Sequence, residues 1–480
     1  MLKNTSWAEH LWSAIFLLFW VAVAAGIDLG ADEAHYLLYG IFLDWSYFDH
    51  PPLVGWIQSF FSYFLGVNSL SARIPALLAT LWTLYELHIV FNLSFKNNLP
   101  FLSTLVPFSL SIFLLPDTLL LPLSLFSFRL LKKIDLSKTY ASILVGIIIG
   151  ACGLTKYTAI FLLPGLILAF FKNVTWQKKS HQFQENWSLW IWIKPALIIT
   201  LSGLVTLTPL FLWNAQHDWI SFKYQYLHLH GEKHFNVLTF LKSLSMQWLG
   251  YGIILVPAMV AIILVTLLQL KSSLVQPLKS PWSNPLFLSA LVMSAYFVHR
   301  SFYTTTLPHW PLLPWYFFWA ITFEKISNRL KKIQFTINFT ILTLIVLIIW
   351  LPVDMKHMIN LKEVKGWPQL LSYLDNNINP DFNIFFSNWS YGSRANLYAS
   401  SNARERLFIL DARFDQFDIW EQKKIRDKMK PGYLVQFPED SINWEELPFK
   451  CQLSSQLNEI SDTKFKKWKH QFYLHFCEPK

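Results

Sequence analysis

The sequence predicts an α-helical protein that crosses a membrane many times and ends in a small α/β domain. The 480 residues are 53% hydrophobic and only 15% charged, whereas a soluble domain carries about 25% charged residues. The mean hydropathy is +0.34. Apolar runs of spanning length recur through residues 1–351. Residues 352–480 are instead rich in Asn, Asp, Lys and Glu and hold no spanning run.

We expect about eleven transmembrane helices, because one crossing takes about 20 apolar residues. They are expected at residues 11–27, 72–93, 100–115, 118–131, 139–154, 157–171, 193–213, 246–270, 283–298, 307–323 and 335–351. The third to sixth form two tight hairpins, broken at LLPDTLL and GLTKYTA, and each hairpin is also compatible with one long buried segment. The first apolar run is long and further spans follow it, which favours a retained helix over a signal peptide.

The charges of the loops support this alternation. With the N-terminus in the cytoplasm, most basic residues fall inside, as the positive-inside rule requires. These inside residues are Lys3, Lys96, Arg129, Lys132, Lys133, Lys138, Lys172, Lys178, Lys179, Lys271, Lys279, Lys325, Arg329, Lys331 and Lys332. The net charge of +10 therefore follows from topology, and we expect no nucleic-acid binding. An odd number of spans places the tail outside.

The tail, residues 352–480, is predicted to be a separate extracytoplasmic domain of about 130 residues, large enough for its own core. The segments FNIFF, RLFIL and YLVQF are typical of strands. The segment DQFDIWEQKKIRDKMK predicts a helix that ends before PG.

Three cysteines occur, without the spacing of a zinc site. Cys152 lies in an apolar run and is expected to serve packing. Cys451 and Cys477 both lie in the tail, and they can pair if that tail is outside the cytoplasm. The GIIIG pattern at Gly146–Gly150 indicates close helix packing.

Ionisable residues collect at the outward ends of the predicted spans. On this topology five outer loops bring carboxylates, imidazoles and cations to one membrane face, where such groups are costly and functional by default. The candidates are Asp28, Asp32, Glu33, His35, Asp44, Asp49, His50, Asp117, Lys156, Tyr157, His217, Asp218, His299, Arg300 and His309.

Each candidate also has a structural alternative. Asp117 can cap a helix that starts after Pro116, and Lys156 can extend to the interface. Asp32 with Glu33 can be a solvated pair, and the neighbours at positions 217 and 218 can form a local hydrogen bond at a span end.

The stretch YFDHPPLVGW places charge and two prolines between apolar residues. Proline is well suited to a first helical turn, and the aromatic residues that follow have helical spacing. We expect an amphipathic interfacial helix from Pro51. Its N-terminus would lie beside Asp49 and His50 and would favour an anion such as phosphate.

The chain resembles the bacterial branch of glycosyltransferase family 39, which includes protein-mannosyltransferase-like and aminoarabinose-transferase-like membrane enzymes. The resemblance rests on DEAHYLLYGIFLDWSYFDHPPLVGW with ARIPALL, LPDTLLL, GLTKYTAIFLLPG, PLFLWNAQHDWISFKYQ, LPHWPLLPWY and YGSRANLYAS. It covers nearly the whole chain and implies a GT-C fold. Aminoarabinose-transferase relatives carry Glu-Lys before the two prolines, where this chain has Asp49 and His50. The sugar and the acceptor therefore stay open.

The resemblance implies an inverting glycosyltransferase that takes a sugar from a polyprenyl phosphate, such as undecaprenyl phosphate, to a hydroxyl group. Inversion needs a base for the acceptor proton. It also needs positive charge at the leaving phosphate. The resemblance implies Asp32 as the base, with Asp117 as second choice or as support. Lys156, Arg300 and His50 would bind the phosphate, and Glu33 would bind donor or acceptor.

The remaining binding candidates are Asp49, Tyr157, His217, Asp218 and His309. No cofactor is expected to be required, and a divalent metal would use Asp49 or His50 with His309. The expected partners are the lipid-linked donor, a lipid-linked, polysaccharide or protein acceptor, and membrane lipid. The implied location is the bacterial inner membrane, with the site facing the periplasm or exterior.

Two other function classes would also use a multi-pass membrane chain. A transporter or flippase of lipid-linked saccharides predicts polar residues at mid-membrane depth and repeat symmetry, whereas the spans are almost wholly apolar. A sensor or scaffold would leave the converging charges unexplained.

Overall fold

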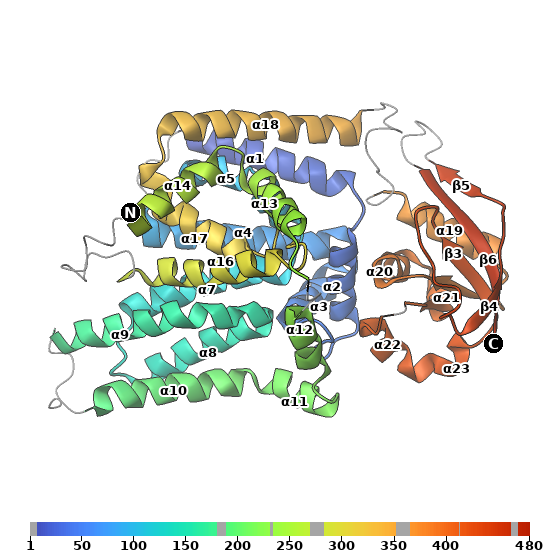
Figure 1. The fold of residues 1–480 in the computed structure, drawn as a ribbon, viewed down its shortest axis with the longest axis horizontal. Helices are drawn as coiled ribbons and strands as arrows, with labels where there is room; N and C mark the ends of the chain where they lie inside the picture. The colour runs from blue at the N-terminus through green and yellow to red at the C-terminus, as the bar shows by residue number, and fades with distance from the viewer. Residues whose placement is uncertain are drawn as a thin grey trace. The chain divides into compact units, whose positions relative to one another are not determined.

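Figure 1 shows the computed structural model, which describes residues 7–179, 189–230, 234–268, 283–351, 365–411, 413–461 and 469–480. Lys3, Lys271, Lys279 and part of the HLHGEKH segment lie outside the described residues.

The helices are α1 (Trp7–Gly26), α2 (Ala31–Ile41), α3 (Leu53–Leu65), α4 (Ser69–Phe91), α5 (Phe95–Leu102), α6 (Leu105–Ile112), α7 (Pro116–Lys133), α8 (Thr139–Thr155), α9 (Leu163–Lys179), α10 (Trp190–Thr206), α11 (Thr208–Gln216), α12 (Ile220–His230), α13 (Val237–Tyr251), α14 (Leu255–Leu268), α16 (Pro285–Ser301), α17 (Leu312–Thr322), α18 (Asn328–Trp350), α19 (Trp367–Asn377), α20 (Trp389–Tyr398), α21 (Ser401–Glu405), α22 (Gln416–Glu421) and α23 (Ile425–Lys428). The strands are β1 (Asn383–Phe386), β2 (Leu407–Ile409), β3 (Gly432–Gln436), β4 (Phe449–Gln452), β5 (Asn458–Ser461) and β6 (Lys469–Pro479).

Within the described residues, three helical stretches are long and apolar enough to cross a membrane: α4, Tyr157–Gln177 and α18. The number rises to seven if each of four bent helix pairs counts as one span. Apolar helices that are shorter, α3 and α8, add to this set. The apolar helices support a multi-pass membrane protein, and the expected number of eleven spans stays a prediction.

The two hairpin breaks expected from the sequence are present. Helices α6 and α7 meet at a bend of 99°, and α7 begins at Pro116, where the missing N–H of proline is tolerated. Helix α8 ends at Thr155, and a 3₁₀ turn, Tyr157–Leu162, leads into α9. Lys156 thus lies between two helical segments, as the GLTKYTA break predicts.

The chain forms two compact units. Unit 1 is Met1–Trp20, Trp45–Val54 and Arg73–Leu344, and unit 2 is Val21–Asp44, Gly55–Ala72 and Ile345–Lys480. The predicted boundary between a transmembrane domain, residues 1–351, and an extracytoplasmic domain, residues 352–480, stays a prediction.

Close helix packing in unit 1 depends on the GIIIG segment. Helices α8 and α10 pack against each other along their length (Figure 1). A Cβ atom added at Gly146 would overlap the Ser202 side chain and the Ile199 carbonyl, and one at Gly150 would overlap Thr206. Glycine is therefore required at this contact, which confirms the packing role expected for the motif.

The tail contains a six-stranded mixed sheet in the order β2-β1-β3-β6-β4, with β5 paired to β6. Strands β2, β1 and β3 are parallel, and β6 is antiparallel to β3, β4 and β5. Both faces of β1 are buried: Ile384 and Phe386 enter one hydrophobic cluster, and Phe385 enters another. This burial explains why Ile384, Phe385 and Phe386 form a continuous apolar run.

The three predicted strands correspond to β1, β2 and β3. The predicted helix is only partly confirmed, because a 3₁₀ turn at Gln422–Lys424 separates α22 from α23. Strands β4, β5 and β6 were not predicted, because their polar side chains weaken the apolar pattern of a strand.

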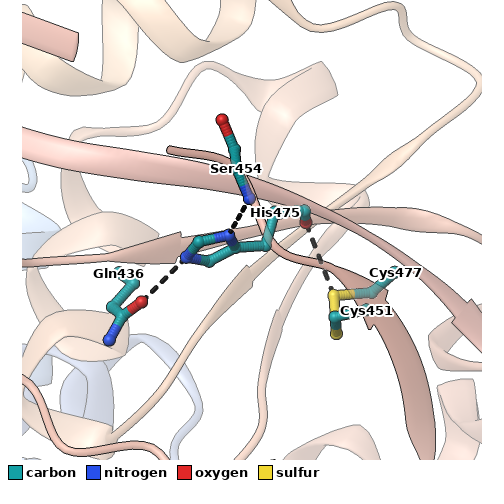
Figure 2. The surroundings of a disulfide bond; sticks show 5 residues. All are labelled: Gln436, Cys451, Ser454, His475 and Cys477. Carbon is teal, nitrogen blue, oxygen red and sulfur yellow. Dashed lines mark hydrogen bonds between the residues drawn. A yellow bond between two sulfur atoms is a disulfide. The ribbon is translucent and has the colours of Figure 1, made fainter. Parts of the chain in front are cut away.

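A disulfide joins Cys451 of β4 to Cys477 of β6, which are direct partners in the strand register (Figure 2). Next to it, the Ser454 N–H donates to His475 Nδ1 at 2.9 Å, and His475 Nε2 lies 2.8 Å from Gln436 Oε1. Because Nδ1 accepts, Nε2 must carry the hydrogen, so this histidine is neutral and links three segments of the sheet.

Cys152 is buried, as expected of a packing residue.

Candidate active site

A buried ion pair between Asp117 and Lys156 forms the centre of the candidate site in unit 1. Lys156 Nζ lies 2.8 Å from Asp117 Oδ1 and 2.6 Å from Oδ2. Lys156 is 9% exposed and Asp117 is 2% exposed. Charges at such depth need a partner, because an isolated one would lose its hydration without compensation.

The two breaks in the helices bring this pair together. Asp117 occupies the first turn of α7, directly after Pro116, where a helix N-terminus favours negative charge. Lys156 is the C-cap of α8, where positive charge is favoured. Asp117 thus lies in the first helical turn, as the capping alternative proposed, but its carboxylate contacts Lys156. The alternative in which Lys156 extends to the interface is wrong, since its ammonium is buried against Asp117.

The Asp49–His50 loop is a tight turn in the same unit. The Tyr47 N–H donates to the His50 carbonyl at 3.2 Å, and His50 Nε2 lies 3.9 Å from Asp49 Oδ2. Helix α12 holds this turn from outside: Ser221 Oγ donates to the Tyr47 carbonyl at 2.9 Å, and Gln225 Nε2 donates to the Asp49 carbonyl at 2.9 Å.

The charges of the ion pair reach this loop and a second histidine. Burial lowers the pKa of His50, and Lys156 acts in the same direction, while Asp49 and Asp117 oppose it. His309 is close enough to Asp117, Lys156 and His50 to feel their charges. The structure therefore brings together five of the predicted site residues in unit 1.

The loop that carries His309 is fixed by α13. Ser243 Oγ accepts the Thr306 N–H at 2.9 Å, and the Tyr251 hydroxyl donates to the Pro308 carbonyl at 2.9 Å. These bonds restrain the backbone on the N-terminal side of His309.

The remaining candidates of unit 1 are placed differently. Tyr157 is the first residue of the 3₁₀ turn after Lys156. His217 stacks on Trp213 at 4.0 Å, and its Nδ1 lies 2.8 Å from the Trp213 carbonyl. Asp218 is exposed, and Arg300 is buried in the last turn of α16. Local bonding thus accounts for His217, and the roles of all four residues stay predictions.

The first-loop acids belong to unit 2. Asp32 is partly exposed in the first turn of α2. Glu33 is 2% exposed, and its Oε2 accepts the Gly30 N–H at 3.0 Å. Their exposure therefore differs, although they are neighbours in sequence, because the Glu33 carboxylate caps its own helix.

A family model described as dolichyl-phosphate-mannose-protein mannosyltransferase matches residues 49–202. The match includes the Asp49–His50 loop and both members of the ion pair. It confirms, over those residues, the family resemblance inferred from the sequence. A comparison with curated proteins finds no match.

Two solved structures are similar to the chain as a whole. One is ArnT from Cupriavidus metallidurans bound to undecaprenyl phosphate, at a TM-score of 0.61, 14% identity and coverage of 98% of each chain. The chain has the fold of ArnT. The apo state of ArnT matches with a TM-score of 0.56, at the same identity and coverage. ArnT is a GT-C membrane protein, so the expected GT-C fold is confirmed.

Within this ArnT-like fold, sequence reasoning missed the residues that hold the site in place. Ser221, Gln225 and Ser243 donate or accept the bonds that fix two loops. Ser221 and Gln225 lie in the segment WNAQHDWISFKYQ, and its resemblance to the family was the only sign in the sequence that these residues matter.

In the part of the chain that the structure describes, no group of three or more His, Cys, Asp or Glu residues is arranged to hold a metal ion.

Proposed function

We propose that this protein is an inverting glycosyltransferase that moves a sugar from a polyprenyl-phosphate donor to a hydroxyl acceptor on the outer face of the bacterial inner membrane. The observation that carries the proposal is the buried Asp117–Lys156 pair beside Asp49, His50 and His309. The family match over residues 49–202 and the ArnT fold support it.

The proposed reaction is a single displacement. The acceptor oxygen attacks the anomeric carbon as the bond from that carbon to the phosphate oxygen breaks. The electron pair of that bond leaves with the phosphate, the acceptor proton passes to Asp32, and the polyprenyl phosphate is released. Asp32 suits this role better than Glu33, whose carboxylate is buried and bonded to the Gly30 N–H.

Lys156 is proposed to bind the phosphate while it remains paired with Asp117. An ammonium carries three N–H donors, and the contacts at 2.8 and 2.6 Å engage two of them. The third is available to a phosphate oxygen. Asp117, with both oxygens engaged, therefore orients Lys156 and is less suited to be the base. Arg300 is proposed to add a second, bidentate cation.

No metal is needed in this scheme, since the cations of the site neutralise the leaving phosphate. If a divalent ion does take part, Asp49 or His50 would hold it together with His309. Helix α3 is proposed to lie in the membrane interface, because Phe60, Tyr63 and Phe64 on it are exposed.

The test is mass spectrometry of envelope glycolipids, polysaccharides and glycoproteins from a deletion strain and from that strain carrying the wild-type or Asp32→Asn protein. We expect one envelope species to lose a sugar mass on deletion and to regain it only with the wild type. Full transfer by Asp32→Asn at equal protein level would remove Asp32 from the role of base. An unchanged envelope after deletion would contradict the transferase itself.

A further inference from the structure

Helix α2, which carries Asp32, packs against the C-terminal domain within unit 2. It contacts α20, the first of the two helices between β1 and β2. Leu38 of α2 lies in the same hydrophobic cluster as Leu370, Ile384 and Ala395. The helix that carries the proposed base and the tail therefore share one hydrophobic core.

A histidine of α2 fixes the rotation of this helix. His35 is 5% exposed, and its Nδ1 lies 2.9 Å from Ser393 Oγ. The Ser393 hydroxyl donates its single hydrogen to the Trp389 carbonyl at 2.8 Å. His35 Nδ1–H must therefore be the donor to Ser393. The ring of Trp389 lies 5.1 Å from the imidazole and that of Trp420 lies 5.8 Å from it.

The residues just before α2 are fixed as well. The Leu29 N–H donates to the Tyr398 hydroxyl at 2.9 Å. Asp28 Oδ2 accepts the N–H groups of Gly366 at 2.7 Å and Trp367 at 3.2 Å. Asp28 thus caps the N-terminus of α19, a favourable place for a carboxylate.

Asp32 lies midway between these two attachments, three residues after Leu29 and three before His35. Asp32 and His35 are both in α2, where residues three apart lie on neighbouring positions of the helix surface. Leu29 lies just before the N-cap, Gly30, so its bond fixes the entry of the chain into the helix. Contacts at both points therefore restrain the direction in which the Asp32 carboxylate projects. Such restraint matters chemically, because misplacing a reacting group by about 1 Å can cost about 100-fold in rate.

We propose that the C-terminal domain orients the base, and that Ser393 and Tyr398 are positioning residues for the transfer reaction. This inference rests on the proposed function, in which Asp32 takes the acceptor proton. Neither positioning residue touches the reacting atoms. Each acts through the backbone of α2 or of the residues that precede it.

The experiment uses the full-length protein with Ser393→Ala, Tyr398→Phe and the double substitution. We expect faster hydrogen exchange of the amides of residues 31–41, and sugar transfer in the complemented deletion strain lowered by about 3- to 10-fold for each single variant and further for the double. Binding of undecaprenyl phosphate by the purified variants is expected to stay within about 2-fold of wild type. Loss of transfer with retained binding is the signature of positioning.

Tyr373→Phe is the matched control, because it removes a hydroxyl that bonds Asn458 inside the same domain. It should change neither α2 exchange nor transfer. Unchanged transfer in the double variant, or unchanged α2 exchange, would overturn the inference, as would transfer and undecaprenyl phosphate binding falling together.

The Asp32→Asn variant separates this inference from the proposed function. Full transfer by Asp32→Asn would refute the base assignment. Transfer abolished by Asp32→Asn but complete in the double variant would refute only the positioning role.

Discussion

Asp117 and Lys156 each carry a charge that the fold has removed from water. Their mutual contact compensates for this loss, and a buried pair of this kind contributes little net stability while making each partner dependent on the other. The structure thus separates two questions: whether the pair is required for folding, and whether the ammonium is required for phosphate.

The first prediction answers both questions. Asp117→Asn leaves the Lys156 ammonium buried without its counter-charge, and we expect the free energy of unfolding in micelles to fall by about 3–5 kcal/mol. Asp117→Leu combined with Lys156→Met removes both charges and should recover most of that stability. The double variant should nevertheless fail to bind undecaprenyl phosphate, because it lacks the Lys156 ammonium. Normal binding by the double variant would show that the pair is structural only.

The second prediction concerns His50 and pH. Burial lowers the pKa of His50 from the usual 6.5. The imidazole is therefore neutral at pH 7 and gains its positive charge only below pH 6.5. The advantage of wild type over His50→Gln in binding undecaprenyl phosphate should therefore be absent above about pH 7 and grow below about pH 6.5. His50→Lys should strengthen binding at pH 7. Comparing variants at each pH cancels the titration of the phosphate itself.

Helix α12 acts at the scale of elements, because it holds the backbone of the Asp49–His50 turn. Ser221 and Gln225 each donate to a carbonyl of this turn. Nothing in the residues themselves marks this helix as a support, since its function depends on where the chain returns in space.

The third prediction tests this support. Ser221→Ala and Gln225→Ala each remove a hydrogen bond worth about 1 kcal/mol, and we expect undecaprenyl phosphate to bind more weakly by about 3- to 10-fold. Lys223→Ala, on the exposed side of the same helix, is the control and should bind normally. If Ser221→Ala and Gln225→Ala bound undecaprenyl phosphate as tightly as the control Lys223→Ala does, the supporting role of α12 would be contradicted.

The fourth prediction concerns the contact between α8 and α10. Gly146→Ala introduces a Cβ atom that overlaps the Ser202 side chain and the Ile199 carbonyl, and the backbone part of this contact cannot yield easily. We expect a loss of about 1–3 kcal/mol in stability, measured by thermal unfolding in micelles. Gly153→Ala is the control, since its Cβ atom meets only the flexible end of Leu207 at 2.8 Å. Equal losses for both variants would mean that the close backbone contact is not the cause.

At the scale of the whole molecule, the disulfide bears on the orientation of the chain. Disulfides persist in oxidising compartments, and the bond between Cys451 and Cys477 lies in the domain that the topology prediction places outside. Charge bias and cysteine chemistry therefore favour the same orientation by independent arguments.

The fifth prediction follows from this bond. In cells, the two tail cysteines should resist thiol labelling until reduced, while Cys152 should react only after unfolding because it is buried. Replacing Cys451 and Cys477 by Ser opens a loop with a sequence separation of 26, and the tail should lose about 3 kcal/mol in stability. Labelling of both tail cysteines without reductant would contradict the outward orientation.

The helical membrane class, the breaks around Asp117 and Lys156, and the first three strands of the tail are all predictable from the sequence. These features depend on local patterns: apolar runs of spanning length, a proline at a helix start and short buried strands. The same patterns marked Asp117, Lys156, Asp49, His50 and His309 as candidates, since charge in an apolar setting is visible without knowledge of the fold.

Which of these residues meet, and which others hold them in place, follows from the three-dimensional packing of the chain. The Asp117–Lys156 pair joins residues 39 positions apart, the support of the Asp49 loop by Gln225 spans 176 positions, and the contact of His35 with Ser393 spans 358. Strands β4, β5 and β6 likewise form through pairing with distant segments. Such contacts leave no period in the sequence, because their partners are chosen by packing in space and not by spacing along the chain.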